Sequence, residues 1–161
     1  MRTLLIVFLL STVATAKIAP PFQGELLGGG RGSLKQYLKA DRVLLVSFWA
    51  TWCSPCLEEL KKVTENLAKD PSLPLEVVTI NVDTAETASD VKPTVRLQGF
   101  SFPVMLDPKQ EIFSKYHQAK TLPFSVLLSP DGNIEATFNG FHEEMFTVVK
   151  NVAAKKNSDA H

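Results

Sequence analysis

The chain has only two cysteines, Cys53 and Cys56, and two residues separate them. A thiol becomes a good nucleophile when it loses its proton. A helix N-terminus favours that loss, because its unpaired N–H groups carry a partial positive charge, and cysteines in such positions have pKa values of about 3.5–7.5. If a helix begins near Cys53, this residue holds the reactive thiolate. Cys56, one turn further along, can then close a disulfide with it, so the spacing predicts dithiol–disulfide exchange.

Three other uses of such a pair agree less well with the sequence. A structural zinc site needs four ligands, and the sequence has no second Cys-x-x-Cys pair. A haem-attachment motif needs a histidine directly after the second cysteine, where this chain has Leu57. A structural disulfide that closes so short a loop removes little entropy from the unfolded chain and would stabilise the fold weakly. We therefore favour the redox interpretation.

The segments on both sides of the pair indicate how it is positioned. Before it, Val43–Trp49 is a nearly continuous apolar run, which is typical of a strand buried on both faces. After it, Cys53–Asp70 predicts a helix, with Pro55 near its start, where proline is tolerated. Leu75–Val82 predicts a second buried strand, which completes a right-handed βαβ unit of the α/β class. The apolar stripe of the helix consists of Leu57, Leu60, Val63 and Leu67.

The rest of the chain predicts further elements around this unit. They are helices at Ser33–Ala40, Thr84–Gly99, Asp107–His117 and Glu143–Lys155, and strands at Phe102–Leu106, Phe124–Leu128 and Ile134–Phe138. The proline- and glycine-rich segment 17–32 predicts a flexible lead-in with one short strand around Gly24–Leu27. We expect one domain over residues 33–156 and a frayed tail at 157–161.

The overall charge and the first segment indicate where the protein works. The 161 residues carry 17 basic and 17 acidic side chains, and this balance argues against nucleic acid as a partner. Residues 1–16 combine Arg2, an apolar run and small residues that end at Ala16. This pattern predicts a secretory signal peptide cleaved after Ala16, with a retained membrane anchor as the alternative. We therefore expect a periplasmic or other extracytoplasmic location, where thiols meet oxidants.

Two motifs resemble those of a known family. The segment FWATWCSPC, ending at Cys56, is similar to the thioredoxin active-site signature, and TLPFSVLLSPDGNI at Thr121–Ile134 is similar to the cis-proline strand and hairpin of that fold. The helix and strand expected within Thr84–Leu106 resemble the insertion of the TlpA/ResA-like extracytoplasmic thioredoxins. The resemblance implies a thioredoxin fold: a central mixed β-sheet flanked by helices, with an extra helix and strand after the second core strand.

The resemblance also implies roles for particular residues. Pro123 matches the family's cis-proline, which faces the disulfide. The backbone of Leu122 would pair with an extended substrate chain beside Cys53. Trp52 matches the aromatic residue that shelters the active cysteine, whereas Trp49 fits the core better.

In its acidic residue the chain departs from thioredoxin. Thioredoxin has a carboxylate beneath the cysteines at the position held here by Ser47. The resemblance to ResA-like members suggests an acid after the second strand, where Glu86 and Asp83 are candidates, and we favour Glu86 as the catalytic acid. Ser54-Pro55 also replaces the Gly-Pro of thioredoxin, so we expect a different reduction potential.

Together these features predict an exported thiol–disulfide oxidoreductase that works as a protein-disulfide reductase. The resemblance implies a monomer without metal or cofactor, disulfide-containing exported proteins such as apocytochromes c as clients, and a membrane thiol as electron donor. A peroxide reductase is one alternative, but its motif P-x-x-x-T/S-x-x-C would need threonine or serine where Ala50 stands. A copper chaperone is the other, but it would need a third residue between the cysteines and a distant histidine such as His117.

Overall fold

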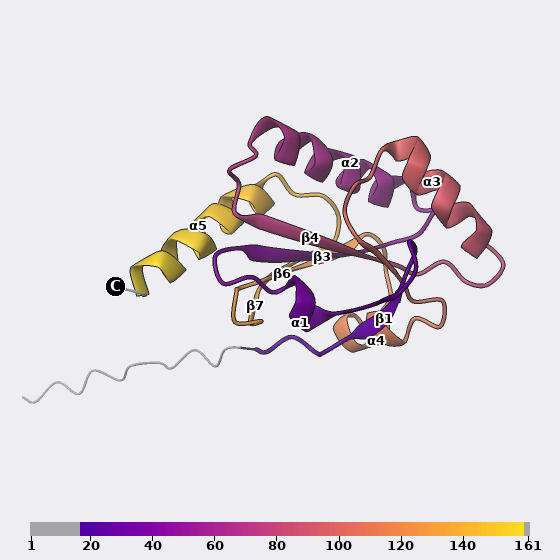
Figure 1. Cartoon of the computed structure of the whole chain (residues 1–161), viewed down its shortest axis with the longest axis horizontal. Coiled ribbons are helices and arrows are strands. Elements are labelled where there is room, and N and C mark those ends of the chain that lie inside the picture. The colour runs from indigo at the N-terminus through magenta and orange to yellow at the C-terminus, as the bar shows by residue number, and fades with distance from the viewer. Residues whose placement is uncertain (1–16, 160–161) are drawn as a thin grey trace, which may run out of the picture.

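The computed structural model describes residues 17–159, which form a seven-stranded mixed sheet with helices on both faces (Figure 1). The strands are β1 (Gln23–Leu26), β2 (Arg31–Ser33), β3 (Val43–Trp49), β4 (Leu75–Asn81), β5 (Val104–Leu106), β6 (Phe124–Leu128) and β7 (Ile134–Phe138), and they lie in the order β2-β1-β5-β4-β3-β6-β7. Strand β4 runs parallel to β3 and β5, and the other neighbouring pairs are antiparallel. The predicted fold class is confirmed. The predicted signal peptide lies outside the described residues.

Helices cover both faces of the sheet. They are α1 (Leu34–Tyr37), α2 (Ser54–Lys69), the 3₁₀ helix η1 (Ala88–Asp90), α3 (Val91–Gln98), α4 (Glu111–Tyr116) and α5 (Glu144–Asp159). Figure 1 shows α2 and α3 on one side, with α1 and α4 on the other. Among residues 17–159, no helix combines the length and the apolar character needed to cross a membrane.

The buried residues form two hydrophobic cores, and strand β3 contributes side chains to both. All seven of its residues are buried, as the apolar run predicted. Because side chains alternate along a strand, Val43 and Leu45 pack with α2 and α5, whereas Phe48 stacks on Phe113 of α4 with ring centroids 4.8 Å apart. The core on the α2 side includes Val43, Leu45, Val63, Leu127, Met145 and Val149. Ser47 is odd-numbered, so its hydroxyl lies on the α2 face.

Most predicted boundaries hold within a few residues. Strands β3, β6 and β7 have the predicted ends, and β3, α2 and β4 form the predicted βαβ unit with parallel strands. The helix expected over Thr84–Gly99 is shorter, since it consists of η1 and α3, with Pro93 in the first turn of α3, where it removes no intrahelical hydrogen bond. Helix α5 continues to Asp159, past its predicted end and into the segment expected to fray.

Within the expected lead-in over residues 17–32, the short strand predicted around Gly24–Leu27 is confirmed as β1, whereas β2, which begins at Arg31, was not predicted. Strands β1 and β2 form a hairpin, and β1 also pairs with β5. The glycines misled the prediction because they serve packing and a turn rather than flexibility. A Cβ added at Gly24 would lie 2.9 Å from Cγ of Met105, and Gly29 and Gly30 adopt φ angles of 93° and 82° in the hairpin turn.

A substitution in β2 tests whether this hairpin belongs to the folded core. A Cβ at Gly32 would lie 2.8 Å from Oη of Tyr37 and 3.1 Å from side-chain carbons of Leu26 and Met105. We expect Gly32→Ala to lower the free energy of unfolding by about 1–3 kcal/mol, as overpacked cores do, in urea denaturation. Gly28→Ala is the matched control, because no atom lies within 4 Å of its added Cβ. Equal stability of the two variants would show that the hairpin does not pack as described.

Candidate active site

The two cysteines form a disulfide at the N-terminus of α2, with their Cα atoms 5.3 Å apart. Cys53 is the N-cap residue, and its carbonyl accepts the amide N–H groups of Cys56 at 3.0 Å and Leu57 at 3.2 Å. The helix follows β3 after a tight turn in which the Cys53 amide donates to the Ala50 carbonyl at 3.1 Å. A buried strand and a helix start therefore position the pair as the sequence predicted.

The two cysteine residues differ slightly in their exposure to solvent. Cys53 is 6% exposed and Cys56 is 1% exposed in this disulfide form. In thiol–disulfide exchange, the more accessible cysteine is the one that an incoming disulfide reaches first. The order of exposure supports Cys53 as the attacking thiol and Cys56 as the resolving thiol.

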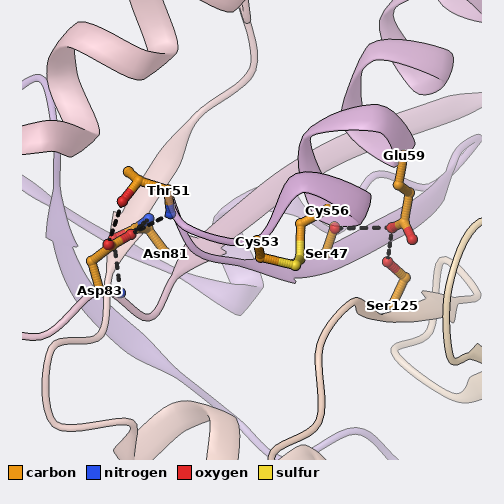
Figure 2. The surroundings of a disulfide bond; sticks show 8 residues. All are labelled: Ser47, Thr51, Cys53, Cys56, Glu59, Asn81, Asp83 and Ser125. Atoms are coloured by element: carbon orange, nitrogen blue, oxygen red, sulfur yellow. Dashed lines mark hydrogen bonds between the residues drawn. A yellow bond between two sulfur atoms is a disulfide. The ribbon is translucent and has the colours of Figure 1, made fainter. Parts of the chain in front are cut away.

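A buried carboxylate, Glu59, lies one helical turn beyond Cys56. It is 0% exposed, and its Oε1 accepts hydrogen bonds from Oγ of Ser47 at 3.1 Å and from Oγ of Ser125 (Figure 2). Ser47 on β3 and Ser125 on β6 are directly paired across the antiparallel strands, so both hydroxyls point to the same face of the sheet. Residues three apart on a helix share a face, and Glu59 and Cys56 therefore both point toward this part of the sheet.

The environment of Glu59 favours its protonated form. Burial raises the pKa of Glu59 above its ordinary value, while the hydrogen bonds from Ser125 and Ser47 and the charge of His142 oppose the rise. Its Oε2 is buried without a hydrogen-bond partner among the described residues. A buried oxygen of this kind can take or hold a proton at low cost. Glu59 is thus suited to exchange a proton within the core beneath the disulfide.

Glu59 is not among the residues predicted for the site, because the buried face of α2 was predicted from its leucine and valine residues alone. A signal was available. Glu59 stands three residues after Cys56 and four before Val63, on the buried face of the helix. In addition, each of the apolar strands β3 and β6 contains one serine, Ser47 and Ser125. A serine in each of two buried strands signals a polar group to be satisfied between them.

The two acids that the sequence analysis considered lie elsewhere. Glu86 is exposed, and its Oε2 accepts a hydrogen bond from Oγ1 of Thr84 at 2.6 Å. Asp83 is buried two residues after the end of β4, and its carboxylate accepts hydrogen bonds from Thr51 and Asn81. The position of Glu86 lends no support to a catalytic role, and the buried acid on the face of α2 that carries Cys56 is Glu59.

The predicted substrate-binding residues differ in their exposure to solvent. The Leu122–Pro123 bond is cis, as the resemblance implied, and both residues are half-buried. Trp52 is 64% exposed and borders a hollow of about 430 Å³. Trp49 is fully buried, which confirms its assignment to the core. Trp52 therefore presents an aromatic surface to solvent next to Cys53 in the chain.

The histidine of the copper alternative has other contacts. His117 has its Nε2 2.7 Å from Oγ1 of Thr121, and its ring stacks on Phe124 at 4.3 Å between centroids. Within the described part of the chain, no three His, Cys, Asp or Glu side chains are grouped so that they could hold a metal ion.

Comparison with known proteins agrees with this geometry. The family model described as AhpC/TSA matches residues 15–145. The sporulation thiol-disulfide oxidoreductase A of Bacillus subtilis (strain 168) is 30% identical over 132 residues, which cover 81% of this chain and 69% of that protein. The thiol-disulfide oxidoreductase ResA of Bacillus thuringiensis (strain Al Hakam) is 36% identical over 118 residues, which cover 73% of this chain and 65% of that protein. The chain thus spans about two thirds of the length of these relatives.

A solved structure shows the same fold. The thioredoxin family thiol:disulfide interchange protein from Chlorobium tepidum TLS superposes with a TM-score of 0.71 at 26% identity, over 87% of this chain and 98% of that one. Fold, cysteine pair and relatives lead to one assignment. The chain belongs to the AhpC/TSA family and, within it, to the thioredoxin-like thiol–disulfide oxidoreductases.

Proposed function

We propose that this protein is an exported protein-disulfide reductase that works through its two cysteines. The observation that carries the proposal is the Cys53–Cys56 disulfide at the start of α2, with the buried Glu59 carboxyl one turn deeper. Thiol–disulfide exchange needs a thiolate, a second thiol within reach and a way to move a proton. This site contains a group suited to each of these tasks.

The proposed cycle conserves atoms and electrons. The Cys53 thiolate attacks one sulfur of a client disulfide, which forms a mixed disulfide and releases a client thiolate. Cys56 then gives its proton to Glu59 in its carboxylate form and attacks Sγ of Cys53, which releases the second client thiolate and closes the Cys53–Cys56 disulfide. Two electrons pass to the client disulfide. A thiol donor then reduces the Cys53–Cys56 disulfide by the same exchange steps in reverse order.

The finer assignment concerns partners and location. We propose that the clients are exported proteins with disulfides, apocytochromes c among them, and that the donor is a membrane thiol protein. The signal-like segment 1–16 and the resemblance to the TlpA/ResA-like proteins support this assignment. The exposed Trp52 and the half-buried Leu122 and Pro123 offer a surface for an extended client segment. The protein is expected to act as a monomer, without a metal or cofactor.

Replacement of Cys53 tests the proposed cycle. We expect the protein to reduce insulin in the presence of a dithiol, and Cys53→Ser to abolish this activity, because no thiolate remains to attack. Insulin turbidity is the measurement. Activity that persists in Cys53→Ser would contradict the mechanism. A tight copper complex that requires His117, together with no insulin reduction, would favour the chaperone alternative.

A second cysteine variant identifies the clients. In Cys56→Ser the resolving thiol is missing, so the mixed disulfide on Cys53 should persist and carry the client into mass spectrometry. We expect exported proteins in the trapped fraction. Apocytochromes alone would support a dedicated role in cytochrome maturation, whereas many different clients would indicate general disulfide reduction. A Cys53→Ser/Cys56→Ser variant shows which proteins are captured without a mixed disulfide.

Replacement of Glu59 tests its part in the second step. Glu59→Gln keeps an oxygen that can accept from Ser47 and Ser125 but cannot take the Cys56 proton. We expect resolution of a preformed mixed disulfide to slow by roughly 10- to 100-fold near neutral pH, at the low end of general-base effects. Stopped-flow release of a labelled peptide from Cys53 measures it. Glu58→Gln is the matched control, because Glu58 is the exposed neighbour on the same helix.

The same experiment decides between the two acids. Glu86→Gln tests the role predicted from the sequence. Slow resolution in Glu86→Gln, together with a normal rate in Glu59→Gln, would reverse the assignment made from burial and hydrogen bonding.

The raised pKa of Glu59 also predicts a pH dependence of stability. Between the ordinary carboxyl pKa of 4.5 and the higher pKa in the folded protein, the folded state keeps a proton that the unfolded chain has lost. This contribution to stability is complete below the ordinary value and is lost as pH rises through the folded pKa. Glu59→Gln is neutral at every pH, so its stability relative to the wild type should increase with pH. Urea denaturation of the oxidised proteins between about pH 4 and about pH 8 measures this difference, and parallel curves would contradict it.

A further inference from the structure

A second buried carboxylate, Asp83, accepts three hydrogen bonds beside the active-site turn. Asp83 is 2% exposed. Its Oδ2 accepts the backbone N–H of Thr51 at 2.8 Å and Nδ2 of Asn81 at 2.6 Å, and its Oδ1 accepts Oγ1 of Thr51 at 2.6 Å (Figure 2). A buried charge is costly unless hydrogen bonds compensate for it. Both oxygens of Asp83 are therefore occupied in holding its neighbours.

The carboxylate itself is anchored in the sheet. The backbone N–H of Asp83 donates to Oδ1 of Asn81 at 3.2 Å, and Asn81 is 1% exposed at the end of β4. The carbonyl of Asn81 accepts the amide of Asp107 at 2.8 Å, which ties this end of β4 to the residue after β5. The backbone of Asp83 is thus fixed to Asn81 at the end of β4, while its side-chain oxygens bind Thr51.

Asp83 binds Thr51, which lies in the turn that leads to the reactive Cys53. Thr51 lies two residues before Cys53, between the end of β3 and the start of α2. One hydrogen bond within the turn, from the Cys53 amide to the Ala50 carbonyl, closes it, and the two that Thr51 donates to Asp83 fix its position relative to the sheet. A displacement of this turn would move Cys53 relative to the N–H groups of the helix terminus.

We propose that Asp83 is a positioning residue, which holds the Thr51 turn so that the Cys53 thiolate forms against the N-terminus of α2. This inference rests on the proposed function. Figure 2 shows Asp83 and Glu59 on opposite sides of the disulfide, Asp83 toward the turn and Glu59 along the helix. The two buried carboxylates thus divide the work: Glu59 is placed to exchange a proton, and Asp83 to fix geometry.

Charge and geometry predict opposite effects, so they can be separated. A negative charge beside a thiolate disfavours it, so if Asp83 acted only by charge, its removal would lower the pKa of Cys53. If Asp83 acts by position, its removal weakens the helix-terminal stabilisation and raises that pKa. Other titratable groups on the surrounding elements, Glu59, Asp90 and His117, are the same in all variants compared.

The experiment measures alkylation of Cys53 across a pH series in a Cys56→Ser background, where only one thiol reacts. The variants are Asp83→Asn, which removes the charge, and Thr51→Val, which removes one hydrogen bond without a change of charge. We expect both to move the reactivity midpoint of Cys53 to higher pH and to slow alkylation about two- to fivefold near neutral pH, the size of helix-terminal effects. Glu58→Gln, which neutralises an exposed carboxylate two residues after Cys56, is the control for nearby charge.

Each outcome supports or overturns the inference. If the reactivity midpoint of Cys53 moves to lower pH in Asp83→Asn and does not shift in Thr51→Val, Asp83 acts by charge alone and the inference is overturned. Wild-type behaviour in both variants also overturns it. If Asp83→Asn fails to fold, Thr51→Val decides alone, since it keeps the carboxylate. Failure of the proposed function is distinguishable, because the unsubstituted protein would then fail to reduce insulin.

Discussion

The start of α2 directly after β3 is the constraint on which this active site depends. A strand buried on both faces ends at Trp49, and after four connecting residues the chain enters a helix that has Cys53 as its N-cap residue and Cys56 in its first turn. The sheet therefore fixes where the helix N-terminus lies, and the helix N-terminus provides the N–H groups that stabilise a thiolate. Glu59 and the Thr51 turn, which Asp83 holds, both lie next to this junction.

Two buried carboxyl groups, those of Glu59 and Asp83, lie on either side of the cysteine pair (Figure 2). A negative charge near a thiol disfavours the thiolate, so this arrangement needs an explanation. The arrangement is tolerable because each carboxylate is satisfied differently. Burial raises the pKa of Glu59, so it remains neutral over a wider pH range and adds less negative charge near the sulfur. Asp83 instead accepts three hydrogen bonds, which compensate its burial. Proton exchange and geometry are thus assigned to separate groups.

The hairpin of β1 and β2 shows where composition misleads. Glycine-rich sequence usually indicates flexibility, but Gly24 and Gly32 face side chains so closely that a Cβ at either position would lie within 3.0 Å of another atom. Whether a glycine marks a linker or a close contact depends on what packs against it. That neighbour, Met105 for Gly24, is 81 positions away in the chain and cannot be identified from local pattern.

Local sequence patterns were enough to predict the features that depend on neighbouring residues: the cysteine pair, the buried strand before it, the helix after it and the later strands in their order along the chain. Periodicity and turn chemistry are local, so they can be recognised without the fold. Which carboxylate is buried on the helix face that carries Cys56 becomes clear only in the fold. Glu59 points into the core because its oxygen is satisfied by Ser125, 66 residues away, and by Ser47. A polar side chain can be buried only where distant partners meet it, and the fold alone brings those partners together.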